Sequence, residues 1–349
     1  MANLTETAYL TRQSIKWGSI GLGVFLILRL VWGVVDTYWQ NTHPAPPPPP
    51  TVAFGKIKPI VFPAQEGLPK ISYRLETIEG TTPSVGSQGK VYFIPKPVAS
   101  LLALDRARLL AGKLGFSSAP TQVSERIYRF SGQNTETTLE MDIISQKFKM
   151  TYDFINDQSV LAEKKLPSNE QAISEAKNFL RQIDLLSDDL AAGEAKVSYF
   201  RLITPDLVPA ISLSEADFVR IDLFRAPLDD YAILPPKPNV SQISFLFSGS
   251  RDNSKRIVEV DYSYNSISLD KYATYPLRTS DIAWQEFSSG QGFVAHLGEN
   301  EDGQVIIRKV YLAYFESENL QDFLQPIYVF EGDRNFVGYL PALDKSWIE

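Results

Sequence analysis

The stretch WGSIGLGVFLILRLVWGVV, residues 17–35, decides how this chain is organised. A run of about twenty apolar residues is long enough to cross the hydrocarbon core of a bilayer as a helix. Trp17 stands at one end of the run, and Tyr38 and Trp39 follow the other end, where interfacial aromatic residues are common. The sequence therefore predicts a single transmembrane helix over residues 17–39.

Flanking charges predict the orientation of this helix. Arg12 and Lys16 precede it and Asp36 follows it, and positive charge is retained on the cytoplasmic side. Residues 1–16 are thus predicted as a cytoplasmic tail, with the rest of the chain outside the cell membrane. A cleaved signal peptide is an alternative, although the apolar run is long and no A-x-A-like site follows it. A buried core helix of a soluble domain is a second and weaker alternative to the transmembrane helix.

Arg29 lies near the middle of the apolar run. A charge at mid-depth costs about 2.5–3.5 kcal/mol on insertion scales and usually pairs or faces protein. Gly18, Gly21 and Gly33 leave small surfaces where a second helix could approach closely. These four residues are the candidate contact with a protein partner in the membrane. The alternative is that Arg29 snorkels toward the interface along its aliphatic stem.

A proline-rich stretch follows the apolar run. Residues 43–50 read HPAPPPPP, and consecutive prolines favour an extended polyproline II rod. Residues 40–70 are therefore predicted to form a stalk that spaces the folded region from the membrane. Docking of the prolines by an SH3-like or WW-like partner is the alternative interpretation.

Composition narrows the classes of function. A net charge of −7 argues against a nucleic-acid binder, and the lack of cysteine excludes disulfides, thiol nucleophiles and Cys-ligated metals. The only histidines are His43 and His296, which leaves no basis for a catalytic triad or a multi-histidine site. Residues 299–303, ENEDG, resemble a calcium loop weakly and a hairpin turn better; Asp229 and Asp230 are interpreted as solvated loop residues. We expect no enzymatic activity, no metal and no cofactor.

The remaining sequence predicts an α+β architecture of three units, each a helix followed by antiparallel strands. The units span residues 71–165, 166–275 and 276–349. The predicted helices cover residues 99–114, a stretch capped by Ser168, and a stretch beginning at Thr279 or Ser280. Predicted strands cover residues 125–130, 138–144, 147–154, 195–203, 218–225, 243–248, 256–264, 292–296, 305–315, 326–331 and 336–341.

Two further predictions concern one segment of the third unit and one segment of the second unit. The run VIIRKVYLAYF, residues 305–315, is apolar on both faces, which predicts a central strand with Trp284 packed on it. Residues 205–238 are rich in Pro and Asp and are predicted to be an insertion or a crossing between units, containing one strand.

SNEQAISEAKNFL, residues 168–180, and TYPLRTSDIAWQEFSSGQG, residues 274–292, followed by VYLAYF and LQPIYVFEG, resemble PepSY-like modules. They look most like the extracytoplasmic regions of the YycH and YycI accessory proteins. That resemblance implies a single-pass protein that modulates a membrane sensor kinase controlling cell-wall metabolism. The matching residues are Tyr275, Pro276, Ser280, Ala283, Trp284, Gly290, Gly292, Val310, Leu312, Tyr314, Leu324, Gln325, Pro326, Tyr328, Val329 and Gly332.

Three functions remain open from the sequence. The first is a non-enzymatic regulatory or scaffolding protein of the cell envelope that acts through protein contacts, with a sensor kinase as the partner that the resemblance implies. The second is an envelope enzyme or protease inhibitor, and the third is a structural subunit of a surface assembly. The sequence leaves the oligomeric state open.

Overall fold

The computed structural model describes residues 4–42, 48–132 and 136–349. It divides into two compact units, Met1–Pro49 and Pro50–Glu349, which are described separately. The predicted polyproline segment lies largely outside the described residues, because residues 43–47, including His43, are not described. We call Pro50–Glu349 the folded body.

The first unit contains α1, Leu4–Thr42. Among the described residues, Ala8–Trp39 forms one helix that is long and apolar enough to span a membrane, with a mean hydropathy of 2.0. None of its most apolar window is buried inside the structure, unlike the core helix of a soluble domain. An exposed apolar helix of this length is compatible with a membrane span or signal anchor.

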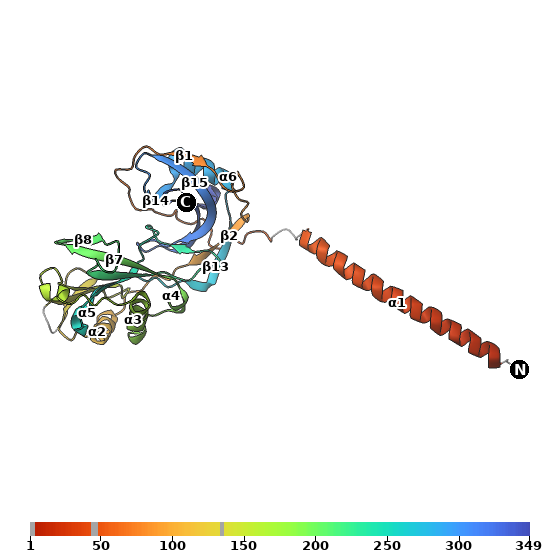
Figure 1. Ribbon diagram of the computed structural model, residues 1–349, viewed down its shortest axis with the longest axis horizontal. Coiled ribbons are helices and arrows are strands. Elements are labelled where there is room, and N and C mark those ends of the chain that lie inside the picture. The colour runs from red at the N-terminus through yellow and green to blue at the C-terminus, as the bar shows by residue number, and fades with distance from the viewer. Residues whose placement is uncertain (1–3, 43–47, 133–135) are drawn as a thin grey trace. The chain divides into compact units, whose positions relative to one another are not determined.

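The folded body is mixed α+β and contains two large sheets (Figure 1). In the described part of the chain, the first sheet has nine strands in the order β3-β4-β5-β6-β12-β11-β9-β7-β8. All neighbouring strands in it are antiparallel. Its strands are β3 Thr121–Gln122, β4 Ile127–Ser131, β5 Thr137–Asp142, β6 Phe148–Tyr152, β7 Ala195–Ile203, β8 Asp206–Pro209, β9 Phe218–Leu223, β11 Ile243–Ser248 and β12 Ile257–Tyr262.

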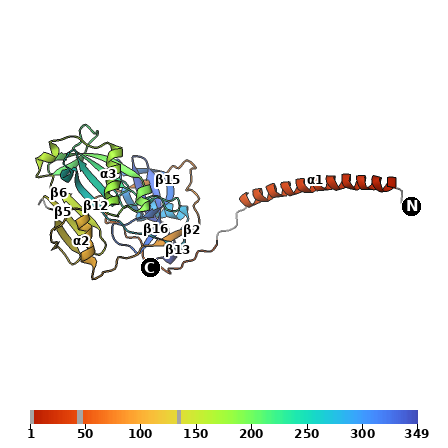
Figure 2. The same ribbon diagram turned by 90° about the horizontal axis from the view of Figure 1, so that it is seen from below.

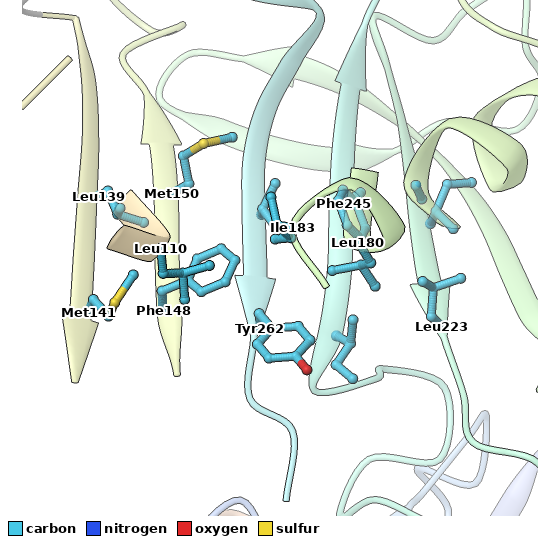
Figure 3. Close-up of a cluster of buried hydrophobic side chains, with 14 of the residues drawn as sticks. Leu110, Leu139, Met141, Phe148, Met150, Leu180, Ile183, Leu223, Phe245 and Tyr262 are labelled. Carbon is cyan, nitrogen blue, oxygen red and sulfur yellow. The ribbon is translucent and has the colours of Figure 1, made fainter. Parts of the chain in front are cut away.

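Helices α2, Ala103–Lys113, and α3, Asn169–Gln182, cover one face of this sheet, and Figure 2 shows them over β5, β6 and β12. The predicted cap of α3 is confirmed, since the Gln171 amide donates to Ser168 Oγ at 3.3 Å. Leu110 and Leu180 are buried against the strands with Phe245 in one cluster (Figure 3). The short helices are α4 Asp188–Ala192, α5 Asn253–Arg256 and η1 Gln158–Leu161.

The first and second predicted units share this sheet. In each, a helix precedes a set of antiparallel strands, and the last strands of the two sets, β6 and β12, pair at the centre of the sheet. The boundary predicted at residue 165 therefore separates two halves of one sheet.

The second sheet collects strands from all three predicted ranges. Its main path is β1-β15-β16-β17-β14; β10 pairs with β15, and β2 pairs with β13 and β16. Its strands are β1 Ser72–Leu75, β2 Gln88–Phe93, β10 Ile233–Leu234, β13 Ser268–Pro276, β14 Phe293–His296, β15 Gln304–Phe315, β16 Phe323–Gly332 and β17 Phe336–Pro341. Sheet membership thus does not follow the ranges 71–165, 166–275 and 276–349.

Two sequence predictions are corrected here. The predicted stalk, 40–70, is too long, because its later part packs on the second sheet: Ile57 is buried and forms a bridge with Ile348. The predicted insertion, 205–238, contains three strands, β8, β9 and β10, instead of one. Both errors come from proline-rich sequence that is extended and yet packed.

The predicted central position of β15 is confirmed. It pairs with β16 on one edge and with β1 and β10 on the other. Val310 and Leu312 are buried in one cluster, and Ala313 and Phe315 in another. Alternate side chains of this strand therefore contribute to two different parts of the core.

Phe287, and not Trp284, is the main aromatic anchor on this sheet. Helix α6, Ser280–Glu286, continues into the π-helical turn η2, Phe287–Gln291. Phe287 is fully buried and stacks on Phe330, with ring centroids 4.1 Å apart, whereas Trp284 is partly buried and its ring centroid lies 6.0 Å from that of Phe330. The short helix η3, Lys345–Trp347, ends the body.

Glycines make room for the Phe287 ring. A Cβ added at Gly292 or at Gly338 would lie 2.2 Å from a ring carbon of Phe287, far closer than van der Waals contact. The ring therefore packs against bare backbone at Gly292, directly before β14, and at Gly338 in β17.

We predict that Phe287→Ala lowers the free energy of unfolding by about 3–5 kcal/mol, because it removes a fully buried ring. Trp284→Ala should cost less, since part of that side chain is already exposed. Gly338→Ala should destabilise through overpacking by about 1–3 kcal/mol. Gly112→Ala in α2 is the matched control: its added methyl meets nothing and should stabilise the helix by up to about 1 kcal/mol. Urea unfolding followed by near-ultraviolet circular dichroism measures all four, and equal costs for Phe287→Ala and Trp284→Ala would contradict this packing.

Candidate functional site

The first candidate site is one face of α1. At about 100° per residue, Gly18, Gly21, Arg29 and Gly33 fall within an arc of roughly 120°. A Cβ added at any of the three glycines would meet nothing within 4 Å, so this face leaves room for a neighbouring helix. Arg29 and Gly33 line one shallow groove together with Leu30; Gly18 and Gly21 lie outside that groove.

The second candidate lies where the two sheets of the folded body are joined. Residues 225–234, which we call the crossing segment, leave β9 of the first sheet and end in β10, which pairs in parallel with β15 of the second sheet. The crossing segment is part of the range that the sequence marked as an insertion. Two of its three charged residues, Arg225 and Asp229, each bind side chains from other elements.

Arg225 holds the start of the crossing segment. Its side chain is 6% exposed. The guanidinium donates to Asp189 Oδ2 at 2.6 Å and to Glu316 Oε1 at 2.8 Å. It also donates to the backbone oxygen of Asn265 and lies over the ring of Tyr264. Asp189 belongs to α4, and Glu316 directly follows β15, so one side chain ties the first sheet's helical layer to the second sheet.

Burial and charge act in opposite directions on the two carboxylates. Burial raises the pKa of Glu316, and the charge of Arg225 offsets this only in part. Burial also acts to raise the pKa of Asp189, but the charge of Arg225, with hydrogen bonds from Ser187, Arg225 and Tyr264, outweighs it and lowers that pKa. One cation therefore faces two carboxylates whose pKa values shift in opposite directions.

Asp229 holds the turn of the crossing segment. It and Asp230 have positive φ angles of 51° and 65°, which non-glycine residues adopt mainly in tight turns. Asp229 accepts hydrogen bonds from Lys90 at 2.9 Å, from Tyr314 at 3.4 Å, and from Tyr92. Asp229 and Asp230 are exposed loop residues, as the sequence predicts, but Asp229 also binds side chains from β2 and β15.

A cleft of about 460 Å³ opens beside Arg225. Its lining combines apolar side chains of the crossing segment, such as Ile233, with Lys196, which donates to Asn239 at 2.7 Å. The ionic groups here bind one another, so the arrangement is suited to holding the two sheets in register and to binding a partner in the cleft.

The remaining sequence candidates occupy ordinary structural positions. Gly303 has a φ of 72°, and its amide donates to Asn300 at 2.9 Å; Asp302 pairs with Arg334 at 3.2 Å. Residues 299–303 thus form a turn in the connection between β14 and β15. The prediction of a hairpin is wrong, because β16 and β17 lie between these two strands in the sheet. His296 ends β14 and is exposed. Across the described ranges, no group of three or more His, Asp or Glu side chains is placed to hold a metal.

Comparison with family models gives no match for this chain, and comparison with curated protein sequences gives none. Among solved structures, the chain is similar to an uncharacterized protein from Eubacterium rectale ATCC 33656. The two share 12% sequence identity with a TM-score of 0.37, over 73% of this chain and 82% of that one. A likeness this weak carries no argument, so the function is inferred from the residues of this chain.

We predict that Arg225→Met lowers the free energy of unfolding by about 3–5 kcal/mol at neutral pH, because two carboxylates lose their buried partner. The loss should shrink as the pH falls toward about 4. Glu316, whose folded-state pKa is raised, is then protonated in both states. The wild type loses the contribution of Asp189, whose folded-state pKa is lowered, as the pH falls further, below about 4.

Arg251→Met is the control for this prediction. Arg251 is 73% exposed and its Nε lies 3.8 Å from Glu163, so the change should cost less than about 1 kcal/mol. Urea unfolding at a series of pH values measures both variants. A loss for Arg225→Met that stays constant or grows with acidification would contradict the assignment of this network.

Proposed function

We propose that this chain is a membrane-anchored, extracytoplasmic, non-enzymatic regulatory or scaffolding protein that acts through protein contacts. The observation that carries the proposal is α1, whose apolar run, residues 17–35, is exposed and contains one charged residue, Arg29, near its middle. An exposed face with Arg29 and three glycines is chemically suited to a second helix that offers a carboxylate or a backbone carbonyl.

The partner class is proposed from the resemblance to PepSY-like modules. The two helix-and-strand halves of the first sheet are assigned as PepSY-like units in this proposal. The YycH and YycI accessory proteins then suggest a sensor kinase of the cell envelope as the partner. The tie between α4, the crossing segment and β15 supports a regulatory role, because a ligand in the cleft beside Arg225 would contact both sheets at once.

The predicted topology can be tested by labelling, because the chain contains no cysteine. Ser14→Cys places a thiol in the tail, and Ile211→Cys places one on the folded body, where Ile211 is 95% exposed. A membrane-impermeant maleimide on intact cells should label Ile211→Cys alone, and Ser14→Cys only after permeabilisation. The reverse pattern, or equal labelling, would contradict an N-terminus inside and a body outside.

The contact in the membrane can be tested by co-purification in mild detergent. Arg29→Leu and Gly33→Leu should weaken a partner's binding by about 1–2 kcal/mol, or roughly 5- to 30-fold, because one removes the polar contact and the other blocks close approach. Gly23→Leu is the matched control, since Gly23 lies outside the arc of the other four residues. An unaltered set of associated proteins in all three variants would leave snorkelling as the account of Arg29.

A further inference from the structure

A group of apolar side chains lies exposed just after β2. Val98, Leu101 and Leu102 are 80%, 104% and 62% exposed. Single exposed apolar residues are normal on protein surfaces, but several in one short segment indicate a surface that another phase or molecule covers. The segment precedes α2, and the buried face of that helix begins at Ala103.

A second exposed apolar group flanks the same end of β2. The register of β13 on β2 shifts between Ser268, which pairs with Phe93, and Tyr272, which pairs with Tyr92. Residues 269–271 have no partner in this register, and both Leu269 among them and Tyr272 next to them are exposed. We call Val98, Leu101, Leu102, Leu269 and Tyr272 the apolar rim.

The strand that carries part of the rim also receives the chain from α1. The Thr51 amide donates to Thr274 Oγ1 at 2.8 Å, and the Thr274 amide donates to Thr51 Oγ1 at 2.9 Å. Residues 43–49 separate α1 from the folded body. A connection of this length spans at most about 30 Å, because a fully extended chain covers at most about 3.6 Å per residue.

From these observations we propose that the apolar rim rests on the surface of the bilayer in which α1 is anchored. Its aliphatic side chains enter the boundary between headgroups and acyl chains, and Tyr272 lies at the headgroup level, where aromatic residues are favoured. Lys271, whose ammonium lies 6.0 Å from the Phe93 ring, adds positive charge beside them. The short connection keeps the rim at high effective concentration near lipid, which favours a bilayer over a diffusing protein.

This inference rests on the membrane anchoring proposed above, and the experiment separates the two. The full chain, with a single introduced cysteine carrying a nitrobenzoxadiazole dye, is reconstituted into phosphatidylcholine vesicles with doxyl-labelled acyl chains. Leu101→Cys reports the rim, Ile27→Cys reports α1, and Ile211→Cys reports an equally exposed apolar position outside the rim. We expect several-fold stronger quenching at positions 27 and 101 than at position 211.

Each of the other outcomes contradicts the contact of the apolar rim with lipid, the anchoring of α1, or both. Quenching at position 27 without quenching at 101 overturns the rim contact and leaves the anchoring intact. Quenching at neither overturns both. A blue-shifted dye at 101 that doxyl lipids do not quench means that protein covers the rim, which also overturns contact with lipid. Leu102→Asp added to the Leu101→Cys chain should abolish quenching at 101 with the circular dichroism spectrum unchanged; persistent quenching there would contradict a role for the rim.

Discussion

The join between the two sheets of the folded body depends on the buried cation of Arg225. A guanidinium as enclosed as that of Arg225 is stable only where carboxylates and carbonyls replace its hydration. Its two carboxylate partners come from α4 on the first sheet's helical layer and from the end of β15 in the second sheet. Ion pairs of this kind contribute little net stability, but they penalise every arrangement in which a partner is missing. The network thereby selects one placement of the crossing segment, and with it the pairing of β10 along β15.

Local signals predicted much of the secondary structure, because they act between neighbouring residues. Ser168 precedes a helix and bonds its third amide, while the ranges 195–203 and 243–248 carry enough β-prone residues to match β7 and β11 as observed. Strands β1, β2 and β13 went unpredicted, since their stability comes from partners far away in the sequence. Lys90, for example, pairs in register with Thr274, and no local pattern encodes that match.

The candidate sites differ in the same way: some can be predicted from neighbouring residues, and others depend on contacts between residues far apart in the sequence. The composition of the apolar run around Arg29 predicts a membrane helix, because a helix in lipid needs a continuous apolar surface. No local sequence pattern marks Arg225, which is a single arginine shortly before a proline in a stretch rich in turn residues. Only the folded structure brings Glu316 within 2.8 Å of it. Likewise, the π-helical turn that buries Phe287 in place of Trp284 depends on bare backbone at Gly292 and Gly338.

The strands of the second sheet come from distant parts of the sequence, and this affects the order in which the folded body can form. All strands of the first sheet lie in the stretch from β3 to β12, which also contains β10 of the second sheet, so the first sheet can form as soon as that stretch is available. The second sheet brackets it: the amide of Ile57 donates to the carbonyl of Trp347, and that of Glu349 to Ile57. Pairing of segments so far apart in the sequence is slow. The chain loses conformational entropy when these segments are brought together, before the contacts that compensate for the loss have formed. A chain emerging on the far side of a membrane would therefore hold a folded half beside unpaired strands, and that interval is when the apolar strands β15 and β16 most need shielding from aggregation.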